Sequence, residues 1–366
     1  MENNDLPKVS VVILNYNGAD LLDEFVPLVA ATQTQLARLE IIIADNGSSD
    51  DSAACAQRLA DLFSPVEALI MPVNRGFAGG YNEALRQIEA DYYVLLNSDV
   101  AVDPHWLDPM IQWMEQYPEL GAVQPKMRWR RHPEYFEYAG AGGGFIDRWG
   151  YPFCRGRIFQ ELERDQGQYD APIPVHWASG ACLMIRADLY HDLGGLDADF
   201  FAHMEEIDLC WRMQHRGYRL VCEPRSVVYH VGGATLSMDS PRKTYLNFRN
   251  NLALLHKNLP FWEHLLVLGV RLPLDLLAAL KDMVTGRMAH AVSVGRAWGH
   301  YLATWSRWSR RRRDIQPKPF KQVEGRLKAS VVWAHFVRNK KRFSQIAQGI
   351  AVDPMPDQSP SHKPLL

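Results

Sequence analysis

The first hundred residues alternate between short apolar runs and longer amphipathic segments. Four apolar runs are expected to be strands, at residues 9–14, 40–44, 68–72 and 92–96, and the first two of them to be buried. Between them, apolar residues recur with helical spacing at 19–37 and 52–63, and a further helix is expected to end at Ile88. Strands that alternate with helices predict an α/β fold with a mostly parallel sheet flanked by helices.

After Pro104 the pattern becomes less regular. Residues 106–117 have helical spacing, and 121–127, 182–186 and 219–222 are strand-like. The segment 128–170 is rich in glycine and aromatic residues, and we expect a long loop or a small hairpin there. A helix that carries three acidic residues is predicted after residue 204, with Gly217 as its C-terminal cap.

The last third of the chain has a different character. From about Thr244 onward the spacing is that of helices, and from Asp353 the chain is rich in Pro and Ser, which favours disorder. We therefore expect three parts: an α/β domain at 1–240, a helical, basic and aromatic region at 241–350, and a disordered tail at 351–366.

Composition restricts the cellular setting. With 366 residues, of which 47% are hydrophobic and 22% charged, the chain can form one large domain or two. Its five Cys residues are widely spaced without a CxxC pair, which argues against a disulfide framework or a zinc site and favours a reducing, cytoplasmic location. The N-terminal residues MENNDLPKV lack the layout of a secretory signal, so we expect no export.

The charge is unevenly distributed. The formal net charge is only −2, but residues 296–342 are rich in Arg and Lys. The apolar runs at 265–268 and 274–280 are interrupted by charged residues such as Arg271, Asp275 and Lys281. No uninterrupted run reaches the roughly 20 residues that cross a bilayer, so no transmembrane helix is expected.

Polar side chains follow each of the first four expected strands. Asn15, Asp45, Asn74 and Asp99 all come at or just after a strand end. In open parallel sheets, ligands bind outside the carboxyl ends of the strands. We therefore expect these residues to form one binding site.

Three of these turns allow both a functional and a purely structural interpretation. Asp45 can accept hydrogen bonds from a base or ribose, although the turn after it can simply cap the next helix. Asp99, in Asn97-Ser98-Asp99, can bind a divalent cation with a diphosphate, or belong to an Asx turn. The sequence NRGFAGGYN from Asn74 permits close backbone approach and brings Arg75 within reach of a phosphate, but its spacing is neither that of a P-loop nor that of a dinucleotide fingerprint.

The sequence FAHMEEIDLCWR contains Glu205, Glu206 and Asp208 at the expected start of a helix. Helical spacing places Glu205, Asp208 and Arg212 on one face, with Glu206 about 100° around the axis. The acids can supply a general base, or they can be first-turn residues that the helix dipole favours. His230, before Gly232, is either a metal ligand or a histidine with ordinary hydrogen bonds.

The order of the motifs carries more information than any one of them. VSVVILNYNG, IIIADNGSSDDS, NRGFAGGYN, LLNSD, WASGACLMIR, GGLDADFFAHMEEIDLCWR and YHVGG together resemble the family 2 inverting glycosyltransferases with the GT-A fold. This resemblance extends from Val9 to Gly233, about 60% of the chain.

The resemblance implies a donor site and a metal site. The nucleotide-sugar contacts map onto ten residues: Leu14, Asn15, Tyr16, Asp45, Asn74, Arg75, Gly76, Asn97, Ser98 and Gly180. The DxD motif, which holds Mg²⁺ or Mn²⁺ against the diphosphate, matches Asn97-Ser98-Asp99 with Asn in place of the first Asp. The metal ligands implied are Asp99 and, at a later position, His230.

The resemblance also implies a catalytic base. The second acid of the family's acidic dyad matches Glu206, where the family usually has Asp, while Asp208 is the second candidate and Glu205 is the first acid of the pair. The implied reaction inverts the anomeric carbon in one displacement, as the base takes a proton from the acceptor hydroxyl.

Finer features resemble bacterial rhamnosyltransferases of cell-surface glycans. They are the NxGFxxGxN and WxSGA sequences and the later Tyr245, Arg249 and Asn250. This resemblance implies a dTDP- or UDP-sugar donor, with dTDP-rhamnose preferred, and a lipid-linked glycan acceptor. Aromatic residues followed by Arg310–Arg313 favour peripheral contact with the inner face of the plasma membrane, although an ordinary helical region with a solvated basic face has the same pattern. These aromatic residues are Phe261, Trp262, Trp298, Tyr301, Trp305 and Trp308.

Two other functions stay open at this point. A non-catalytic nucleotide-sugar or glycan-binding module could have the same fold. A nucleotidyltransferase is disfavoured because NYNGAD, after the first strand, has no basic residue. No basic surface pattern in the first domain indicates a nucleic-acid partner.

Overall fold

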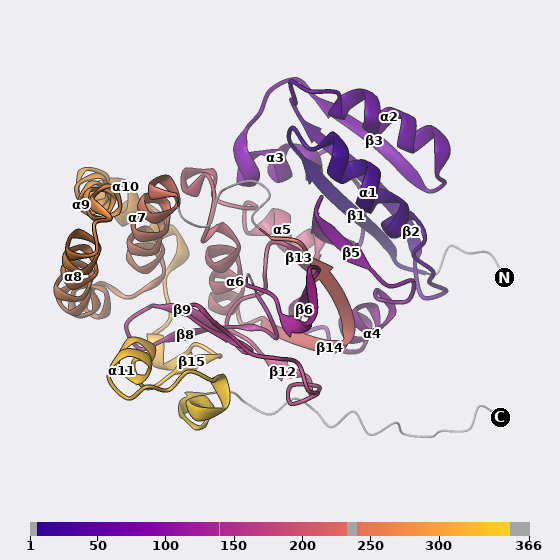
Figure 1. Cartoon of the computed structure of the whole chain (residues 1–366). Helices are drawn as coiled ribbons and strands as arrows, with labels where there is room; N and C mark the ends of the chain where they lie inside the picture. The colour runs from indigo at the N-terminus through magenta and orange to yellow at the C-terminus, as the bar shows by residue number, and fades with distance from the viewer. Residues whose placement is uncertain (1–5, 139, 233–239, 352–366) are drawn as a thin grey trace.

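A computed structural model of the chain describes residues 6–138, 140–232 and 240–351. Its centre is a mixed sheet in the order β12-β14-β6-β13-β4-β1-β2-β3, with β5 paired to β14 and β7 paired to β6. A second, smaller sheet lies beside it, and helices α7–α10 gather as one group at the side (Figure 1). The expected α/β architecture with a helical C-terminal region is confirmed.

The first half of the sheet forms as the apolar pattern predicts. Its elements are β1 (Lys8–Asn15), α1 (Ala19–Ala30), β2 (Arg38–Asn46), α2 (Ser52–Leu62), β3 (Val66–Met71), α3 (Gly76–Leu85) and β4 (Tyr92–Asn97). Strands β4, β1, β2 and β3 are neighbours in that order and are parallel. Val11 and Val12 on β1 belong to apolar clusters on opposite faces of the sheet, so this strand is buried on both sides.

Helix α1 is shorter than its apolar spacing predicts. It ends at Ala30 rather than at residue 37. The hydroxyl of Thr32 donates to the carbonyl of Val29 at 2.6 Å. Such a local side-chain bond offers the backbone an alternative to further helix, which the hydrophobic pattern cannot reveal.

The other half of the main sheet adds antiparallel strands. Its elements are β5 (Val100–Val102), α4 (Asp108–Gln116), β6 (Leu120–Trp129), β7 (His132–Phe136), β12 (Ile173–Pro174), β13 (Cys182–Arg186), α5 (Ala187–Asp192), α6 (Glu205–Arg216) and β14 (Arg219–His230). Strand β13 is antiparallel to β4 and β6, whereas β14 is parallel to β6. Strand β14 is longer than the expected 219–222 and ends at His230, and Gly217 terminates α6 in the left-handed conformation as predicted.

The glycine-rich segment 128–170 contains more structure than one hairpin. It contributes β7 and the strands β8 (Gly144–Asp147), β9 (Pro152–Cys154), β10 (Arg157–Ile158) and β11 (Glu161–Leu162). These last four join β15 (Arg326–Leu327) and β16 (Ile350–Ala351) in the second sheet. Because β8 pairs with β15 from the C-terminal region, local sequence alone does not define this sheet.

The C-terminal region is mainly helical. Its helices are α7 (Pro241–Asn258), α8 (Phe261–Val284), α9 (Met288–Ala303), α10 (Trp305–Ile315) and α11 (Val331–Phe336). In the described parts of the chain, no helix has the length and apolar character needed to span a membrane. Ala351, expected in the tail, is paired in β16, and the remainder of that expected tail, 352–366, lies outside the described residues.

Several aromatic residues of this region face inward. Tyr301 and Trp308 are buried, and the Tyr301 hydroxyl lies 2.9 Å from a ring nitrogen of both His256 and His264. Trp298 donates to Asp275 at 3.1 Å. The expectation that these aromatic side chains contact a membrane is therefore wrong for Tyr301 and Trp308, because they pack the helices together.

Candidate active site

The carboxyl ends of β1 and β2 form a polar, buried corner. Asn15 and Asp45 are paired in register, and the Asn15 side chain donates to Asp45 at 3.1 Å. Asp45 also accepts the backbone N–H and the hydroxyl of Ser48, at 3.0 and 2.6 Å. Both Asn15 and Asp45 are buried, and Asn15 Oδ1 has no hydrogen-bond partner among the described residues. A buried polar atom without a partner is unfavourable unless a ligand or water completes it.

Asn46, which the sequence analysis did not single out, connects this corner to the glycine-rich turn. Its side chain donates to the Asn74 side chain at 3.2 Å and to the Gly76 carbonyl at 3.0 Å, and it accepts the Arg75 backbone N–H at 3.1 Å. The Arg75 side chain is more than half exposed and lies 3.7 Å from Glu83. The expected donor residues Asn74–Gly76 therefore lie at the end of β2, with Arg75 directed toward solvent.

The Asn97-Ser98-Asp99 turn lies next to β1, because Leu14 and Asn97 are partners in register. Asp99 joins β4 to β5, and its carboxylate Oδ1 lies 3.0 Å from Nε2 of His230 at the end of β14. On the other side, Nδ1 of His230 lies 3.1 Å from the carboxylate of Glu137, a buried acid that sequence reasoning missed.

The charges of this group shift its ionisation. Burial alone lowers the pKa of His230, but the carboxylates of Glu137 and Asp99 outweigh that effect and raise it to about 10. Burial raises the pKa of Asp99, and the hydrogen bond and charge of His230 bring it below its usual value. Asp99 and His230 thus form a buried ion pair at the edge of the site.

Asp99 and His230 are the residues that would hold a divalent cation at this edge of the sheet. Two neighbouring ligands of an octahedral Mg²⁺ site, each about 2.1 Å from the ion, lie about 3 Å apart. A carboxylate oxygen and a neutral imidazole nitrogen both suit such a cation, but Asp99 Oδ1 and His230 Nε2 point at each other across the 3.0 Å of their ion pair. Both can serve as ligands only after His230 has lost its proton and the two side chains have turned toward the ion. Within the described ranges, no group of three or more His, Cys, Asp or Glu residues has a metal-binding arrangement.

The chain enters α6 through an unusual backbone. Phe201, His203 and Met204 all have left-handed backbone angles, with φ between 67° and 76°. Residues other than glycine are uncommon in this conformation, which costs of the order of 1–3 kcal/mol for each. The loop is therefore held in shape by its surroundings, and it directs the first turn of α6 toward the sheet edge.

Glu205 and Glu206 begin α6 in different environments. Glu205 is buried, and its pKa is raised well above the usual value by burial and by the charge of Glu206. Glu206 is half-buried, and burial raises its pKa to about 7. Each has an oxygen, Oε2, without a hydrogen-bond partner among the described residues. A carboxylate with a pKa near 7 and an unused oxygen suits a general base.

Asp208 is in the opposite situation. It is fully buried and accepts hydrogen bonds from Arg212, Lys257 and Asn258, each at 2.8 Å. Burial raises its pKa, but the charges of Lys257 and Arg212 lower it to about 2. The carboxylate is therefore charged, surrounded by donors and shielded from solvent.

Two glycines bring the donor turn and the acidic helix together. A Cβ atom added at Gly76 lies 3.3 Å from the ring of Phe201, and one at Gly180 lies 3.6 Å from Cβ of Glu206. These close approaches place the turn at the start of α3, the loop before β13 and the start of α6 side by side. Glu206 therefore lies at the same sheet edge as the expected donor residues.

Helix α7 fixes the loop before α6. The Asn250 side chain donates to three carbonyls of that loop, those of Phe200, Ala202 and His203, at 2.7 to 2.9 Å. Arg249 donates to the Phe200 carbonyl at 2.8 Å and to the Asn250 side chain at 2.7 Å. Arg249 and Asn250 were predicted only as part of a resemblance, and nothing in the local sequence indicated that they hold a loop some fifty residues earlier.

The fold and the polar edge define the class of protein, a glycosyltransferase of the GT-A type. Residues 10–194, just over half of the chain, match Glycosyl transferase family 2, and the chain belongs to that family. The matched part includes Asn15, Asp45, Asp99 and Gly180, and it ends before α6.

Curated relatives agree with this family at low identity. An N-acetylglucosaminyl-diphospho-decaprenol L-rhamnosyltransferase of Mycobacterium tuberculosis is 27% identical over 60% of this chain and 75% of its own length. An O-antigen biosynthesis protein of Myxococcus xanthus is 28% identical over 64% of this chain but only 18% of its own length. A poly-beta-1,6-N-acetyl-D-glucosamine synthase of Staphylococcus aureus is 27% identical over 64% of this chain and 52% of its own length.

Solved structures share the fold. GalNAc-T7, solved with UDP, GalNAc and Mn²⁺, aligns with a TM-score of 0.61 over 94% of this chain and 58% of its own, at 15% identity. A mannosyltransferase from Pyrobaculum calidifontis, solved with GDP-Man and Mn²⁺, aligns with a TM-score of 0.50 over 86% of both chains, also at 15% identity. At this identity the likeness concerns the fold alone.

Proposed function

We propose that this protein is a metal-dependent inverting glycosyltransferase that moves a sugar from a nucleotide diphosphate donor to a hydroxyl of a lipid-linked cell-surface glycan. One observation carries the proposal: Glu206, with a pKa raised to about 7 and an oxygen free of partners among the described residues, lies beside Gly180 at the carboxyl edge of the parallel strands. A base is therefore available where a donor sugar binds in this fold.

The donor site consists of the strand-end residues. Asn15 and Asp45 hold the nucleoside, with Leu14 and Tyr16 beside them. The turn Asn74–Gly76, together with Asn97, Ser98 and Gly180, surrounds the diphosphate and the sugar. Two observations support this arrangement. The Asn15–Asp45 hydrogen bond and the contacts of Asn46 fix the turns after β1 and β2, and Oδ1 of Asn15 has no hydrogen-bond partner among the described residues, so it is available to a ligand.

In the transfer, the Glu206 carboxylate takes the proton of the acceptor hydroxyl. The acceptor oxygen forms a bond to the anomeric carbon as the bond from that carbon to the diphosphate oxygen breaks, and the electron pair leaves with the nucleoside diphosphate. One displacement inverts the anomeric carbon and needs no covalent sugar intermediate. Asp208 serves to position α6, because its carboxylate already accepts from Arg212, Lys257 and Asn258.

Asp99 and His230 are the proposed ligands of Mg²⁺ or Mn²⁺. When bound, the cation supplies positive charge that stabilises the departing diphosphate. The adjacent positions of the two side chains, after β4 and at the end of β14, support the assignment, because a carboxylate and a neutral imidazole are both ligands of divalent cations. Glu137, on the far side of the His230 ring, orients that ring.

The finer specificity follows the relatives. We propose L-rhamnose from dTDP-rhamnose as the transferred sugar, supported by the name of the mycobacterial relative. We also propose that residues 1–240 form the catalytic domain and that 241–350 bring it to the cytoplasmic face of the plasma membrane, where a lipid-linked acceptor is accessible.

A donor screen tests this function. The thermal unfolding of the wild-type protein is followed with dTDP-, UDP- and GDP-sugars in the presence of Mg²⁺ or Mn²⁺, and a matching donor is expected to raise the midpoint. The stabilising donor is then used to measure transfer to a lipid-linked acceptor. Stabilisation without turnover for every acceptor supports a non-catalytic binding module instead, and no stabilisation by any donor contradicts the donor site.

A further inference from the structure

Helix α8 has an inverted distribution of polarity. The stripe that faces the protein contains His264, Val267, Arg271 and Asp275, all buried. The opposite stripe is exposed and apolar, and its members include Trp262, Leu266, Leu272, Leu276, Leu280 and Val284. A helix that packs on a protein and has water on its outer face normally carries polar residues on that outer face. The apolar outer face of α8 therefore indicates that it is covered by something other than water.

The exposed apolar surface continues beyond α8. Met288 and Val292 on α9 are about half exposed, and Trp333, Phe336 and Val337, at and just after α11, are each more than half exposed. We call the exposed stripe of α8, these two residues of α9 and these three residues near α11 the apolar face. Large contiguous apolar surface of this kind is rare on monomeric proteins in water.

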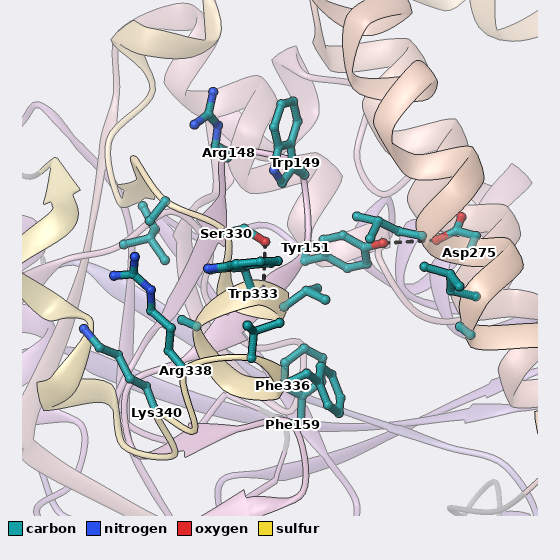
Figure 2. A pocket seen from close by; sticks show the side chains of 18 of the residues that line it. Arg148, Trp149, Tyr151, Phe159, Asp275, Ser330, Trp333, Phe336, Arg338 and Lys340 are labelled. Atoms are coloured by element: carbon teal, nitrogen blue, oxygen red, sulfur yellow. Dashed lines mark hydrogen bonds between the residues drawn. The ribbon is translucent and has the colours of Figure 1, made fainter. Parts of the chain in front are cut away.

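A cavity of about 1120 Å³ opens between α8, α11 and the second sheet. Figure 2 shows part of its lining, with the Trp333 ring in the centre and Phe159 and Phe336 together below it. To the right of Trp333, the Tyr151 hydroxyl donates a hydrogen bond to Asp275 on α8. Leu274, Leu277 and Ala278 of α8 also line it, so the cavity is continuous with the apolar face. Its volume exceeds that of most small-molecule pockets and is ample for a long hydrocarbon chain.

Cationic side chains border the cavity. Arg148, Lys281, Arg338 and Lys340 line it, and none of these four forms an ion pair with the described residues. Arg338 and Lys340 extend along one side of the cavity in Figure 2, with Arg148 above them. The two acids of the lining are already paired, Asp275 with Arg271 and Asp282 with Arg287. The uncompensated charge beside the apolar face is therefore positive.

We propose that the apolar face docks on an anionic lipid bilayer, and that the cavity takes a hydrocarbon chain of an anionic lipid whose head group contacts Arg148, Lys281, Arg338 and Lys340. Apolar side chains that insert into the interface, next to basic residues that meet anionic head groups, are the features of a monotopic membrane surface. The proposal rests on the proposed function, because it names the surface by which the enzyme reaches its lipid-linked acceptor.

The surface lies next to the catalytic machinery. Thr244 and Phe248 of α7 line the cavity, while Arg249 and Asn250 of the same helix hold the loop before Glu206. A lipid in the cavity therefore contacts the helix that fixes the base loop.

Vesicle cosedimentation of the full chain tests the proposal. We expect the wild type to bind vesicles of phosphatidylglycerol and phosphatidylcholine at least tenfold more tightly than vesicles of phosphatidylcholine alone. The double variant Leu276→Glu/Leu280→Glu should bind the anionic vesicles at least tenfold less tightly, as should Lys281→Glu/Arg338→Glu. Leu62→Glu, which changes an equally exposed leucine on α2, and Lys321→Glu, outside the cavity lining, are the matched controls and should bind like the wild type.

Occupation of the cavity has its own measurement. Lipids brominated along the acyl chain should quench the fluorescence of the wild type, and Trp333→Phe should lose a larger part of that quenching than Trp129→Phe. Binding that is equal for both vesicle types, or a Leu276→Glu/Leu280→Glu variant that binds like the wild type, overturns the proposal. A wild-type dimer that this variant converts to a monomer also overturns it, because a second copy then covers the apolar face.

Transfer to a water-soluble acceptor separates the two proposals. If the membrane surface is wrong and the function is right, turnover of the soluble acceptor persists and vesicle binding is absent. If the function is wrong and the surface is right, vesicle binding persists without turnover.

Discussion

Asp208 Oδ2 and Lys257 Nζ lie 2.8 Å apart inside the protein and join α6 to α7. Arg212 and Asn258 also donate hydrogen bonds to the Asp208 carboxylate, so Asp208 contacts three donors and is shielded from solvent. The same helix thus presents Glu206 to the site and anchors itself through Asp208.

This anchor predicts a stability effect for Asp208→Asn. Removal of one partner of a buried ion pair costs about 3–5 kcal/mol, because the other charges stay buried without compensation. Chemical denaturation should therefore show a loss of this size, whereas Asp103→Asn, a change at an exposed acid, should leave the stability unchanged. A normal stability together with a loss of turnover would instead identify Asp208 as the base.

Glu206→Gln should abolish turnover and leave donor binding intact. General base catalysis contributes about 10²- to 10⁴-fold, and glutamine cannot accept the proton. Initial rates and donor titrations measure the two effects separately. Glu205→Gln is the matched control: burial and the charge of Glu206 raise the pKa of Glu205 well above its usual value, which favours its protonated form, so a neutral glutamine should change the rate less than tenfold.

The pH dependence of turnover should follow Glu206. Burial raises its pKa to about 7, and the base works only when deprotonated, so kcat should rise with pH through about 7 and then level off. The free energy of unfolding should have the opposite slope between about pH 4.5 and 7, because the folded protein binds a proton that the unfolded chain has released. Glu206→Gln should reduce that slope, to which the raised pKa of Glu205 contributes with the same sign. A turnover rate that does not rise with pH near 7 would contradict the assignment.

Asn250→Ala should lower kcat without raising KM for the donor. The three carbonyls that Asn250 holds belong to the loop before Glu206, so its loss misplaces the base while the strand-end residues stay in position. A decrease of tenfold or more in kcat is expected. Asn247→Ala on the same helix is the control, and an equal decrease in both variants would indicate a general effect on α7.

Asp99→Ala should weaken Mn²⁺ binding at least tenfold in the presence of a nucleoside diphosphate. The change removes one of the two proposed protein ligands and the partner of His230. Calorimetric titration of Mn²⁺ measures this directly, without reference to turnover. Asp103→Asn serves as control, and an unchanged affinity in Asp99→Ala would exclude the metal assignment.

The parallel half of the fold was predictable because its signals are local. Each apolar run is followed by a polar turn, so β1, β2, β3 and β4 follow from the pattern, although β3 lies at the edge of the sheet and is only partly buried. The second sheet did not follow, because strands of two to four residues carry little periodicity and β8 depends on a partner, β15, about 180 residues later.

The site was predictable in position but not in the roles of its acids. Strand ends placed Asn15, Asp45 and Asp99 at one edge, as found. Helical spacing separated Glu206 from Asp208 but could not show which of them is the better base. The reason is that Lys257 and Asn258, which donate hydrogen bonds to Asp208 and hold it as a carboxylate, come from another helix. The inward position of Tyr301 was missed for the same reason: its partners, His256 and His264, come from two other helices.

The left-handed loop before α6 has an energetic consequence. Three side-chain-bearing residues at positive φ, Phe201, His203 and Met204, together cost several kcal/mol, a large share of the roughly 5–15 kcal/mol by which a domain is usually stable. Glycine at Met204 would relax the backbone, and it would also release the conformation that presents Glu206. The most stable version of this protein and the most active one are therefore expected to be different sequences, and they differ first at the entrance to α6.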